Sequence, residues 1–290
     1  MRKKNVETLP IRSFNDKVAS NFEIVAINGD GKGQGLNVEA HRHDYYHILY
    51  IKQGLGKHVI DFKTYQVKPN SIFFVSPGQV HSLAIDSSVE AYVLTFNADF
   101  YALNNNMQSL LDYPFFHSIT NAPVVYLPTH QAKIQATLDE IFMEYTLSEK
   151  GKETILRALL EVLLVRAARM YQTPANDDAP AYLTFQLRKL EALIDAHFKE
   201  HKLLNDYAEM MHISPKHLNS LCKKGLNKTV TNLIHERTLT EAKRLLLFTD
   251  NAIAEIAFEL GFADKSYFMR FFKKHTGVTG DTYRKEGKNR

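Results

Sequence analysis

The sequence predicts two domains, the first mainly β and the second mainly α. A chain of 290 residues suits two domains better than one. Residues 22–97 are rich in β-branched and aromatic residues, whereas beyond residue 180 apolar residues recur three and four apart. Between them QTPANDDAP, residues 172–180, has two prolines and no apolar residue larger than alanine. We therefore predict domains at 1–171 and 181–290, joined by a linker at 172–180.

The composition is that of a soluble globular protein, with 44% hydrophobic and 23% charged residues. No apolar run approaches the roughly 18 residues that a membrane span needs, and no signal-peptide core follows the basic start MRKKNVETLP. The single cysteine, Cys222, excludes an internal disulfide and a cysteine-based zinc cluster. We expect a cytoplasmic protein with no membrane partner.

Short strands account for the first domain. FEIVAI, YHILYIK, HVIDF, SIFFVS and AYVLTF are separated by turn-forming stretches such as NGDGKGQG, KQGLGK and SPGQ. Strands of this length and spacing predict a small β-barrel or sandwich.

Two amphipathic helices follow the strands between residues 130 and 171. Their apolar residues are Ile134, Leu138, Ile141, Phe142 and Tyr145, then Ile155, Leu156, Leu159, Leu160, Leu163 and Leu164. The helices either pack only on the barrel or also supply the seam of a homodimer, and the pattern leaves both open.

The excess of basic over acidic residues lies entirely in the second domain. Residues 181–290 contain 19 Lys and Arg against 13 Asp and Glu, which leaves 17 against 19 for residues 1–180. This asymmetry points to a polyanion partner for the last 110 residues.

AIAEIAFELGFADKSYFMRFFKK, residues 252–274, predicts a helix-turn-helix. A short helix buries Ile253, Ile256, Ala257 and Leu260, and Gly261 makes the turn. Asp264 caps a second helix that buries Phe268, Phe271 and Phe272 and leaves its other faces basic. The second helix of such a unit enters the major groove of DNA.

LLNDYAEMMHISPKHLNSLCKK, residues 203–224, repeats this order. Leu204, Tyr207, Ala208 and Met211 pack in its first helix, Ser214 caps the second, and Pro215 takes its first position. The candidate DNA-binding residues of the two units are Lys216, His217, Asn219, Ser220, Lys223, Lys224, Lys265, Ser266, Met269, Arg270, Lys273 and Lys274.

SPKHLNSLCKK and EAKRLLLFTDNAIAEIAFELGFADKSYFMRFFKKHTGVTGDTYR resemble the DNA-binding domain of the AraC/XylS transcription regulators, from about residue 190 to 285. The resemblance implies an all-α, seven-helix domain whose two recognition helices read adjacent major-groove segments of double-stranded DNA. Two departures stand out. Gly280 replaces a usual proline, and KKGLNKTV departs from the usual run after the first recognition helix.

The resemblance places Lys216, Asn219 and Ser220 of the first recognition helix, and Lys265, Ser266, Met269 and Arg270 of the second, against the bases. We expect Arg270 to bind a guanine and Asn219 an adenine, each through two hydrogen bonds. Lys223, Lys273 and Lys274 are expected to meet phosphates, which set affinity more than sequence preference.

Histidines gather in the first domain, in EAHRHDYYHILYI at residues 39–51 and in PGQVH at residues 77–81. Strand alternation places His41, His43, Tyr45 and His47 on one face, so at least three imidazoles can converge. We predict that these residues, with His81, bind a ligand.

These segments are similar to the cupin-like sensor barrel that many AraC/XylS regulators carry. Metal-dependent cupins place two His, a Glu and a later His on the inner wall, which maps here onto His41, His43, His47 and His81, with His in place of Glu. Three interpretations stay open: a pocket for an organic ligand, a structural cap, and a metal site for Zn, Fe, Ni or Cu. We expect an organic ligand, no metal and no cofactor.

An aromatic acid is the first ligand to test. Its ring would stack on aromatic side chains, and its carboxylate would meet the histidines. The aromatic candidates are Tyr45, Tyr46, Tyr50, Phe73, Phe74 and Tyr92.

No Gly-rich phosphate loop or serine-nucleophile motif occurs in the sequence, and we expect no enzyme activity. The sequence favours a homodimeric transcription regulator, an activator by resemblance, controlled by a small-molecule effector. RNA polymerase is the further partner that the family implies. The alternatives are a ligand-independent DNA-binding dimer and a metal-binding cupin sensor or oxygenase.

Overall fold

The computed structural model of the chain describes residues 8–9, 21–28, 37–102, 110, 113–116, 121–127, 132–171 and 181–288. The chain divides into two compact units, residues 7–174 and residues 175–290. The linker predicted at 172–180 and all but the first residue of NGDGKGQG lie outside the described residues.

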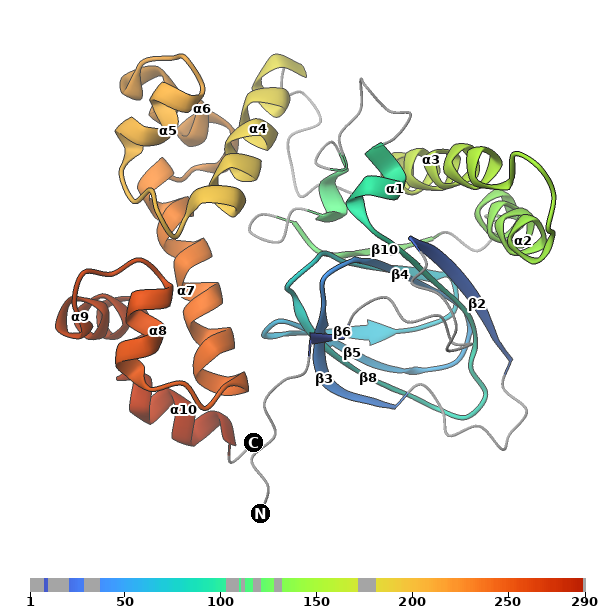
Figure 1. Cartoon of the computed structure of the whole chain (residues 1–290), viewed down its shortest axis with the longest axis horizontal. Helices are drawn as coiled ribbons and strands as arrows, with labels where there is room; N and C mark the ends of the chain where they lie inside the picture. The colour runs from blue at the N-terminus through green and yellow to red at the C-terminus, as the bar shows by residue number, and fades with distance from the viewer. Residues whose placement is uncertain are drawn as a thin grey trace. The chain divides into compact units, whose positions relative to one another are not determined.

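The first unit is built on two five-stranded sheets (Figure 1). Their orders are β1-β3-β8-β5-β6 and β10-β7-β4-β9-β2, and every pairing is antiparallel except that of β1 with β3. The strands are β1 Thr8–Leu9, β2 Phe22–Asn28, β3 Val38–His43, β4 Tyr46–Gln53, β5 Gly56–Ile60, β6 Lys63–Val67, β7 Ser71–Val75, β8 Val80–Ile85, β9 Glu90–Phe96 and β10 Val124–Tyr126.

The predicted β-rich first domain is confirmed, and the strands absent from the predicted set include β1, β6, β8 and β10. β6 has few apolar residues, and β1 and β10 are short, so they stand out less than the longer apolar runs. HVIDF is not one strand: β5 ends at Ile60, and the chain turns at Asp61, whose φ is 54°.

Strand β4 is buried on both faces, which explains its unbroken apolar run ILYI. Leu49 and Ile51 join the core between the two sheets, whereas Ile48 and Tyr50 join the core on the outer face of their sheet. Successive side chains of a strand point to opposite faces, so the two cores take alternate residues of β4.

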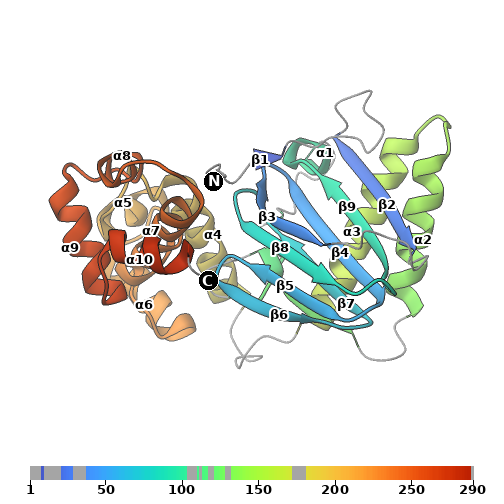
Figure 2. The same ribbon diagram turned by 90° about the horizontal axis from the view of Figure 1, so that it is seen from below.

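Helices cover that outer face (Figure 2). They are α1 Ala98–Ala102, the short 3-10 helix η2 Pro114–Phe116, α2 Ala132–Thr146 and α3 Lys152–Met170. Leu156, Leu160 and Leu163 of α3 are buried in this core, so the predicted packing of the helices on the barrel is confirmed. Met143, Ile155 and Val162 stay exposed, and a homodimer seam along these helices remains a prediction.

The second unit is entirely helical. Among its described residues, 181–288, there are seven helices, as the family resemblance implied: α4 Ala181–His197, α5 Leu204–Met210, α6 Pro215–Leu226, α7 Val230–Phe248, α8 Ile253–Glu259, α9 Lys265–Thr276 and α10 Gly280–Lys288. In the part of the chain that the structure describes, no helix combines the length and apolar character needed to cross a membrane.

The second unit contains an internal repeat in which equivalent residues stand fifty positions apart. Ser214 caps α6 and Asp264 caps α9, through side chains that accept from the backbone N–H of His217 and Tyr267. The two helices end on Asn227 and Gly277 in the left-handed conformation. The second helix of each helix-turn-helix thus begins with a side-chain cap and ends with a left-handed residue.

Candidate DNA interface and histidine site

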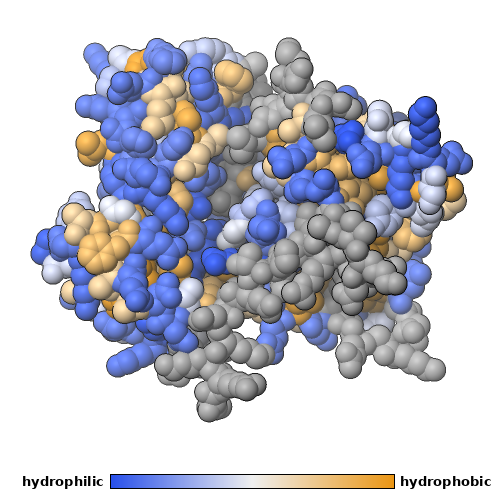
Figure 3. All heavy atoms as spheres, in the orientation of Figure 1, coloured by the Kyte–Doolittle hydropathy of each residue, from blue (hydrophilic) through white to orange (hydrophobic). Residues whose placement is uncertain are grey.

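The two recognition helices, α6 and α9, present the predicted DNA-binding residues at the surface. The exposed members of the set are Lys216, His217, Ser220, Lys223 and Lys224 on α6, and Lys265, Ser266, Arg270, Lys273 and Lys274 on α9. Asn219 and Met269 are half-buried. Hydrophilic residues also cover much of the visible face of this unit (Figure 3). Contact of these residues with DNA remains a prediction.

Buried aromatic side chains fix the orientation of α9. Phe268 and Phe272 are fully buried, and the ring of Phe268 packs 5.3 Å from that of Phe262 in the preceding turn. The turn itself needs glycine: Gly261 has a φ of 75°, and a Cβ there would lie 1.8 Å from the carbonyl oxygen of Lys199. Orientation and turn both follow from the sequence, as predicted.

Helix α7 separates the two recognition helices along the unit (Figure 1). Its 19 residues span about 28 Å at 1.5 Å per residue. Major-groove segments on one face of DNA recur every 34 to 36 Å or so. The length of α7 is therefore of the order needed for α6 and α9 to reach successive segments.

Asn219 has a structural partner that the sequence did not reveal. Its side-chain oxygen Oδ1 accepts a hydrogen bond of 3.1 Å from the backbone N–H of Val230, the first residue of α7. The first N–H groups of a helix have no partner within the helix. Asn219 thus ties α6 to the start of α7, and its Oδ1 is already engaged before any base approaches.

Tyr267 is a candidate that the sequence analysis missed. It lies in the first turn of α9, 56% exposed, with its ring 5.7 Å from that of Phe262. The sequence analysis assigned Phe268, Phe271 and Phe272 to the buried face and did not name Tyr267 as a DNA contact. An exposed aromatic ring beside Ser266 and Arg270 adds a group that can contact bases or sugars.

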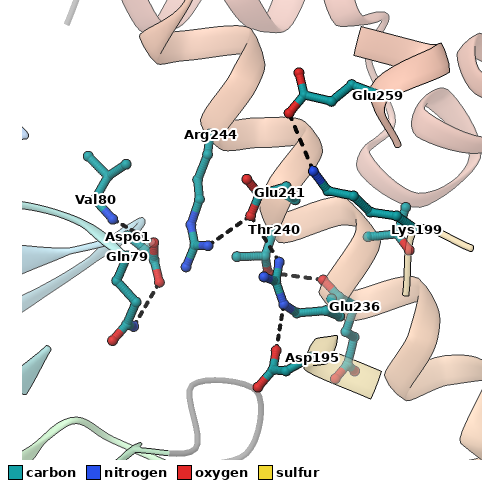
Figure 4. A network of polar contacts seen from close by, with 12 residues as sticks. Asp61, Gln79, Val80, Asp195, Lys199, Glu236, Thr240, Glu241, Arg244 and Glu259 are labelled. Carbon is teal, nitrogen blue, oxygen red and sulfur yellow. Dashed lines mark hydrogen bonds and ion pairs between the residues drawn. The ribbon is translucent and has the colours of Figure 1, made fainter. Parts of the chain in front are cut away.

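A buried ionic network stiffens the frame behind the recognition helices (Figure 4). Arg237 binds Asp195 of α4 at 2.6 Å, and both Arg237 and Arg244 bind Glu241 of α7, at 3.0 and 2.9 Å. Burial raises the pKa of Glu241, but the charges of Arg244 and Arg237 outweigh it, so the net pKa lies below the ordinary value.

Five histidines converge at the histidine site, between the two sheets of the first unit. His41, His43, His58 and His81 come from β3, β5 and β8 of one sheet, and His47 comes from β4 of the other. His41 pairs directly with His81 across the strands, and their ring centroids are 4.3 Å apart. The ring of His47 lies 5.5 Å from that of His43 and 5.3 Å from that of His81. The predicted convergence of His41, His43, His47 and His81 is present. The expectation that His41, His43, Tyr45 and His47 share one strand face is wrong, because the chain bends at Asp44 and Tyr45 between β3 and β4.

His58 was missed by the sequence analysis, although strand alternation could have found it. It shares the inward face of β5 with Ile60 and is fully buried. Its Nε2 lies 3.0 Å from Nδ1 of His81. A single histidine in an apolar strand belongs to no motif. Only the alternation of side chains along β5 indicates that His58 points inward.

Hydrogen bonds assign the tautomer of the first pair of imidazoles. Nδ1 of His41 lies 2.8 Å from the carbonyl oxygen of Glu39, so this nitrogen carries the hydrogen and donates it. Neutral His41 then has a lone pair at Nε2, which lies 3.0 Å from Nε2 of His43. In a neutral pair, His43 Nε2–H donates to His41.

Three of the histidines, His47, His58 and His81, favour the neutral form. Burial, followed by the charge of His41, lowers the pKa of His47 to about 4. Burial, followed by His47 and His41, lowers the pKa of His58 to about 3. The pKa of His81 is also well below its ordinary value, mainly because of burial. At neutral pH these three imidazoles are lone-pair donors without charge.

Most of the aromatic residues proposed to stack on a ligand do not face the histidines. Tyr46, Tyr50, Phe74 and Tyr92 belong to the core under the helices, on the other face of their sheet. The expectation that they line one pocket with the histidines is therefore wrong. Tyr45 remains, with its ring 4.3 Å from that of His43, as does Phe73, 4.9 Å from His58.

Among the described residues, His41, His43 and His81 form a group that could hold a metal ion. One ligand atom of each lies within 4.8 Å of the other two, and all three residues are buried. His47, the fourth residue of the cupin-like pattern, faces this group from the other sheet but is outside it.

Two family models match the chain. Residues 24–164 match the model described as an AraC-like ligand binding domain, and residues 207–286 match a helix-turn-helix domain. The first covers the strands from within β2 to β10, the histidine site and most of α3, and the second runs from α5 into α10.

Curated relatives extend over both units. The chain is 23% identical over 244 residues to the HTH-type transcriptional activator RhaS of Enterobacter sp. (strain 638), covering 81% of this chain and 83% of that protein. It is 25% identical over 245 residues to RhaS of Salmonella schwarzengrund (strain CVM19633), with the same coverage.

Two solved structures are also similar to the chain. The C-terminal domain of AraT, a response regulator from Geobacillus stearothermophilus, is 32% identical, covers 35% of this chain and 84% of its own, and has a TM-score of 0.34. ToxT from Vibrio cholerae is 15% identical, with 91% and 98% covered and a TM-score of 0.43.

Proposed function

The chain belongs to the AraC/XylS family of DNA-binding transcription regulators, and from this membership we propose that it is an effector-controlled activator. Its C-terminal unit carries the helix-turn-helix domain and its N-terminal unit the ligand-binding domain of the family. Activation is the sign that we assign, because the curated relatives are named transcriptional activators.

The observation that carries this function is the repeated helix-turn-helix. Two recognition helices with matching caps, basic outer faces and buried anchors are held at the two ends of one long helix. We assign base contacts to Lys216, Ser220, Lys265, Ser266, Met269 and Arg270, and phosphate contacts to Lys223, Lys224, Lys273 and Lys274. His217 contributes at the edge of α6.

The effector acts at the histidine site, through His41, His43, Tyr45, His47 and His81. For the effector to regulate anything, it must bind two conformations of the first unit with different affinity. The two conformations must also differ in how they present α6 and α9 to DNA. The coupling is reciprocal, so bound DNA changes the affinity for the effector by the same factor.

The remaining assignments follow from the regulatory function. We assign the protein to the cytoplasm, where bacterial DNA and RNA polymerase meet, and RNA polymerase is its partner in activation. We propose a homodimer whose seam includes the exposed strip Met143, Ile155 and Val162 on α2 and α3. We assign no enzyme activity, since the family consists of transcription regulators.

Selection of binding sites from a random duplex library tests the DNA function with the full chain. We expect enriched duplexes to contain two specified segments about 10 base pairs apart, centre to centre, one for each recognition helix. Enrichment of a single segment would contradict the paired recognition helices, and failure to enrich any sequence would contradict specific DNA binding.

The alternative is a constitutive DNA-binding dimer in which the first unit only dimerises. The exposed strip on α2 and α3 favours dimerisation, and the histidine site favours sensing. A metabolite and metal screen that follows DNA affinity on the selected duplex separates the two. No effect of any compound would favour the constitutive dimer.

A further inference from the structure

The histidine site offers imidazole nitrogens in a space suited to a single atom. His41, His43 and His81 are 5 to 8% exposed, and one ligand atom of each lies within 4.8 Å of the other two. Borderline transition metals such as zinc, nickel and copper accept imidazole ligands, whereas calcium and magnesium require oxygen ligands. The donor set therefore matches a transition metal and excludes the hard cations.

The hydrogen bonds around these rings are those of metal ligands. A histidine that binds a metal through one nitrogen usually donates the other N–H to a nearby acceptor. His41 donates Nδ1–H to the carbonyl oxygen of Glu39 and so leaves its Nε2 lone pair free to bind. His58 Nε2, 3.0 Å from Nδ1 of His81, is an acceptor in the equivalent place.

The spacing of the nitrogens of His41 and His43 also fits. Zinc binds imidazole at about 2.0 to 2.1 Å, so tetrahedral ligand nitrogens stand roughly 3.4 Å apart. Nε2 of His41 and Nε2 of His43 are 3.0 Å apart in the metal-free arrangement. A metal ion can take the place of the hydrogen between them once the proton of His43 moves from Nε2 to Nδ1. Both imidazoles then stay neutral, and no proton leaves the protein.

Buried nitrogens at this site are without hydrogen-bond partners among the described residues. They are Nε2 of His81, Nδ1 of His47 and Nδ1 of His58. A buried polar atom without a hydrogen-bond partner lowers the stability of the fold. Such atoms are therefore expected at sites where a bound ligand supplies the partner. His81 and His58 are at least 95% buried, which leaves a bound ion as the natural partner for Nε2 of His81.

We propose that His41, His43 and His81 bind a divalent transition-metal ion, zinc or nickel, and that this ion is the effector of the regulator. His47 faces the three ligands from the opposite sheet and is the fourth imidazole of the site. His58 is a positioning residue that orients His81. The binding site stands on the geometry alone, whereas the effector role rests on the proposed regulatory function.

Metal analysis of the full chain, purified without a histidine tag and stripped with a chelator, tests the site. After incubation with zinc and removal of the excess, we expect about one equivalent per chain and a raised thermal midpoint. Less than about 0.1 equivalent would overturn the proposal, because a preformed buried site should fill.

Variants locate the ion. His43→Gln and His81→Gln should lose the bound zinc, and His58→Phe should weaken zinc affinity by about 10 to 100-fold through loss of the acceptor for His81. Thermal melting of each metal-free variant checks that it folds. If His43→Gln does not fold, His58→Phe still provides a test. Unchanged zinc affinity in a folded His58→Phe chain would contradict the role of His58 in orienting His81 as a zinc ligand.

A surface pair of histidines provides the control. His197 and His201 lie one helical turn apart at the end of α4, with ring centroids 5.9 Å apart, and such a pair can bind zinc adventitiously. The double variant His197→Gln/His201→Gln should keep the full equivalent of zinc. If zinc is lost with this pair and kept in His81→Gln, the proposed site is wrong.

Binding to a selected DNA duplex separates the metal proposal from the regulatory function. Specific binding by the metal-free or the zinc-loaded chain supports the DNA function whatever the metal does. A change in DNA affinity of about fivefold or more on zinc loading, absent in His81→Gln, supports the effector role. Zinc bound at the site with no change in DNA affinity would overturn that role and leave the DNA function standing.

Discussion

Asn219 Oδ1 accepts a hydrogen bond from the backbone N–H of Val230, 3.1 Å away, and so joins the first recognition helix to the start of α7. Reading adenine through two hydrogen bonds needs both the oxygen and the amide nitrogen of an asparagine. With Oδ1 engaged, we expect Asn219 to position α6 more than to read a base. The equivalent residue of the second unit, fifty positions on, is Met269, which has no such acceptor.

We therefore predict that Asn219→Leu lowers stability more than it changes sequence preference. The substitution leaves the buried N–H of Val230 without a partner, which should cost about 1 to 3 kcal/mol. Asn219→Asp keeps an acceptor oxygen and should retain stability. Urea denaturation measures the first effect and library selection the second. A stable Asn219→Leu chain that no longer prefers adenine at one position would support a base contact.

Arg270 and Lys273 lie on the same helix and should differ in what they contribute. Arg270→Ala removes a side chain that can bind guanine through two hydrogen bonds, so we expect a loss of about 1 to 3 kcal/mol and relaxed preference at one base pair. Lys273→Ala should weaken binding to all sequences alike and reduce the slope of log affinity against log salt by about one. Binding isotherms at several salt concentrations distinguish them. An unchanged operator affinity in Arg270→Ala would show that α9 is wrongly assigned.

The two helix-turn-helix units were predictable because their requirements are local. Each of their features depends on a few consecutive residues: the caps at Ser214 and Asp264, the turn at Gly261 and the aromatic anchors of α9. The hydrogen bond from Val230 to Asn219 was not predictable, because it joins residues on separate helices and depends on how they pack. Tyr267 was overlooked, although the helical spacing that puts Phe268, Phe271 and Phe272 on the buried face already places Tyr267 on another face.

In the first unit, alternation correctly placed His41 and His43 on one face, but it did not foresee the bend at Asp44 and Tyr45 that puts His47 on the opposite sheet. His41, His43, His47 and His81 come together as expected. His58 was missed because it belongs to no motif; alternation indicates that it faces inward, and the pairing of β5 with β8 brings it to His81. The aromatic residues were misjudged because β4 and β7 are buried on both faces, so residue type did not separate the inner face from the outer. With four of those rings under the helices, an aromatic acid at the histidine site keeps only Tyr45 and Phe73 as stacking partners.

Gly280 and Gly277 should respond oppositely to alanine. Gly280 begins α10, its φ is not positive, and a Cβ there would make ordinary contacts of 3.4 and 3.5 Å with Leu246 and Ile253. Gly280→Ala should therefore raise stability by about 0.4 to 1 kcal/mol, because the unfolded chain loses freedom. Gly277 ends α9 with a φ of 81°, so Gly277→Ala should lower stability by about 1 kcal/mol. Thermal unfolding of both variants tests this pair. A destabilised Gly280→Ala chain would show that α10 needs glycine at its start.

Glu241 should contribute far more to stability than Glu236, although both belong to ion pairs of α7. Glu241 is 8% exposed and forms ion pairs with two arginines. Glu241→Gln leaves their positive charge buried without a counter-charge and should lower the free energy of unfolding by about 3 kcal/mol. Glu236 pairs with Lys228 at the surface, 2.8 Å away, with about two fifths of each side chain exposed, so Glu236→Gln should cost less than about 1 kcal/mol. Urea denaturation at neutral pH compares the two.

The contribution of Glu241 should also depend on pH, with a sign set by its lowered pKa. The folded state holds this pKa below the ordinary value of 4.5, so the unfolded chain binds the proton more readily. The stabilisation is then fully present above about pH 4.5 and is lost as the pH falls towards the folded pKa. The difference in stability between the natural chain and Glu241→Gln should accordingly shrink below pH 4.5 and stay constant between pH 6 and 8, or thereabouts. A difference that stayed constant down to pH 3 or so would mean that Glu241 titrates alike in both states, and that the two arginines do not hold its charge.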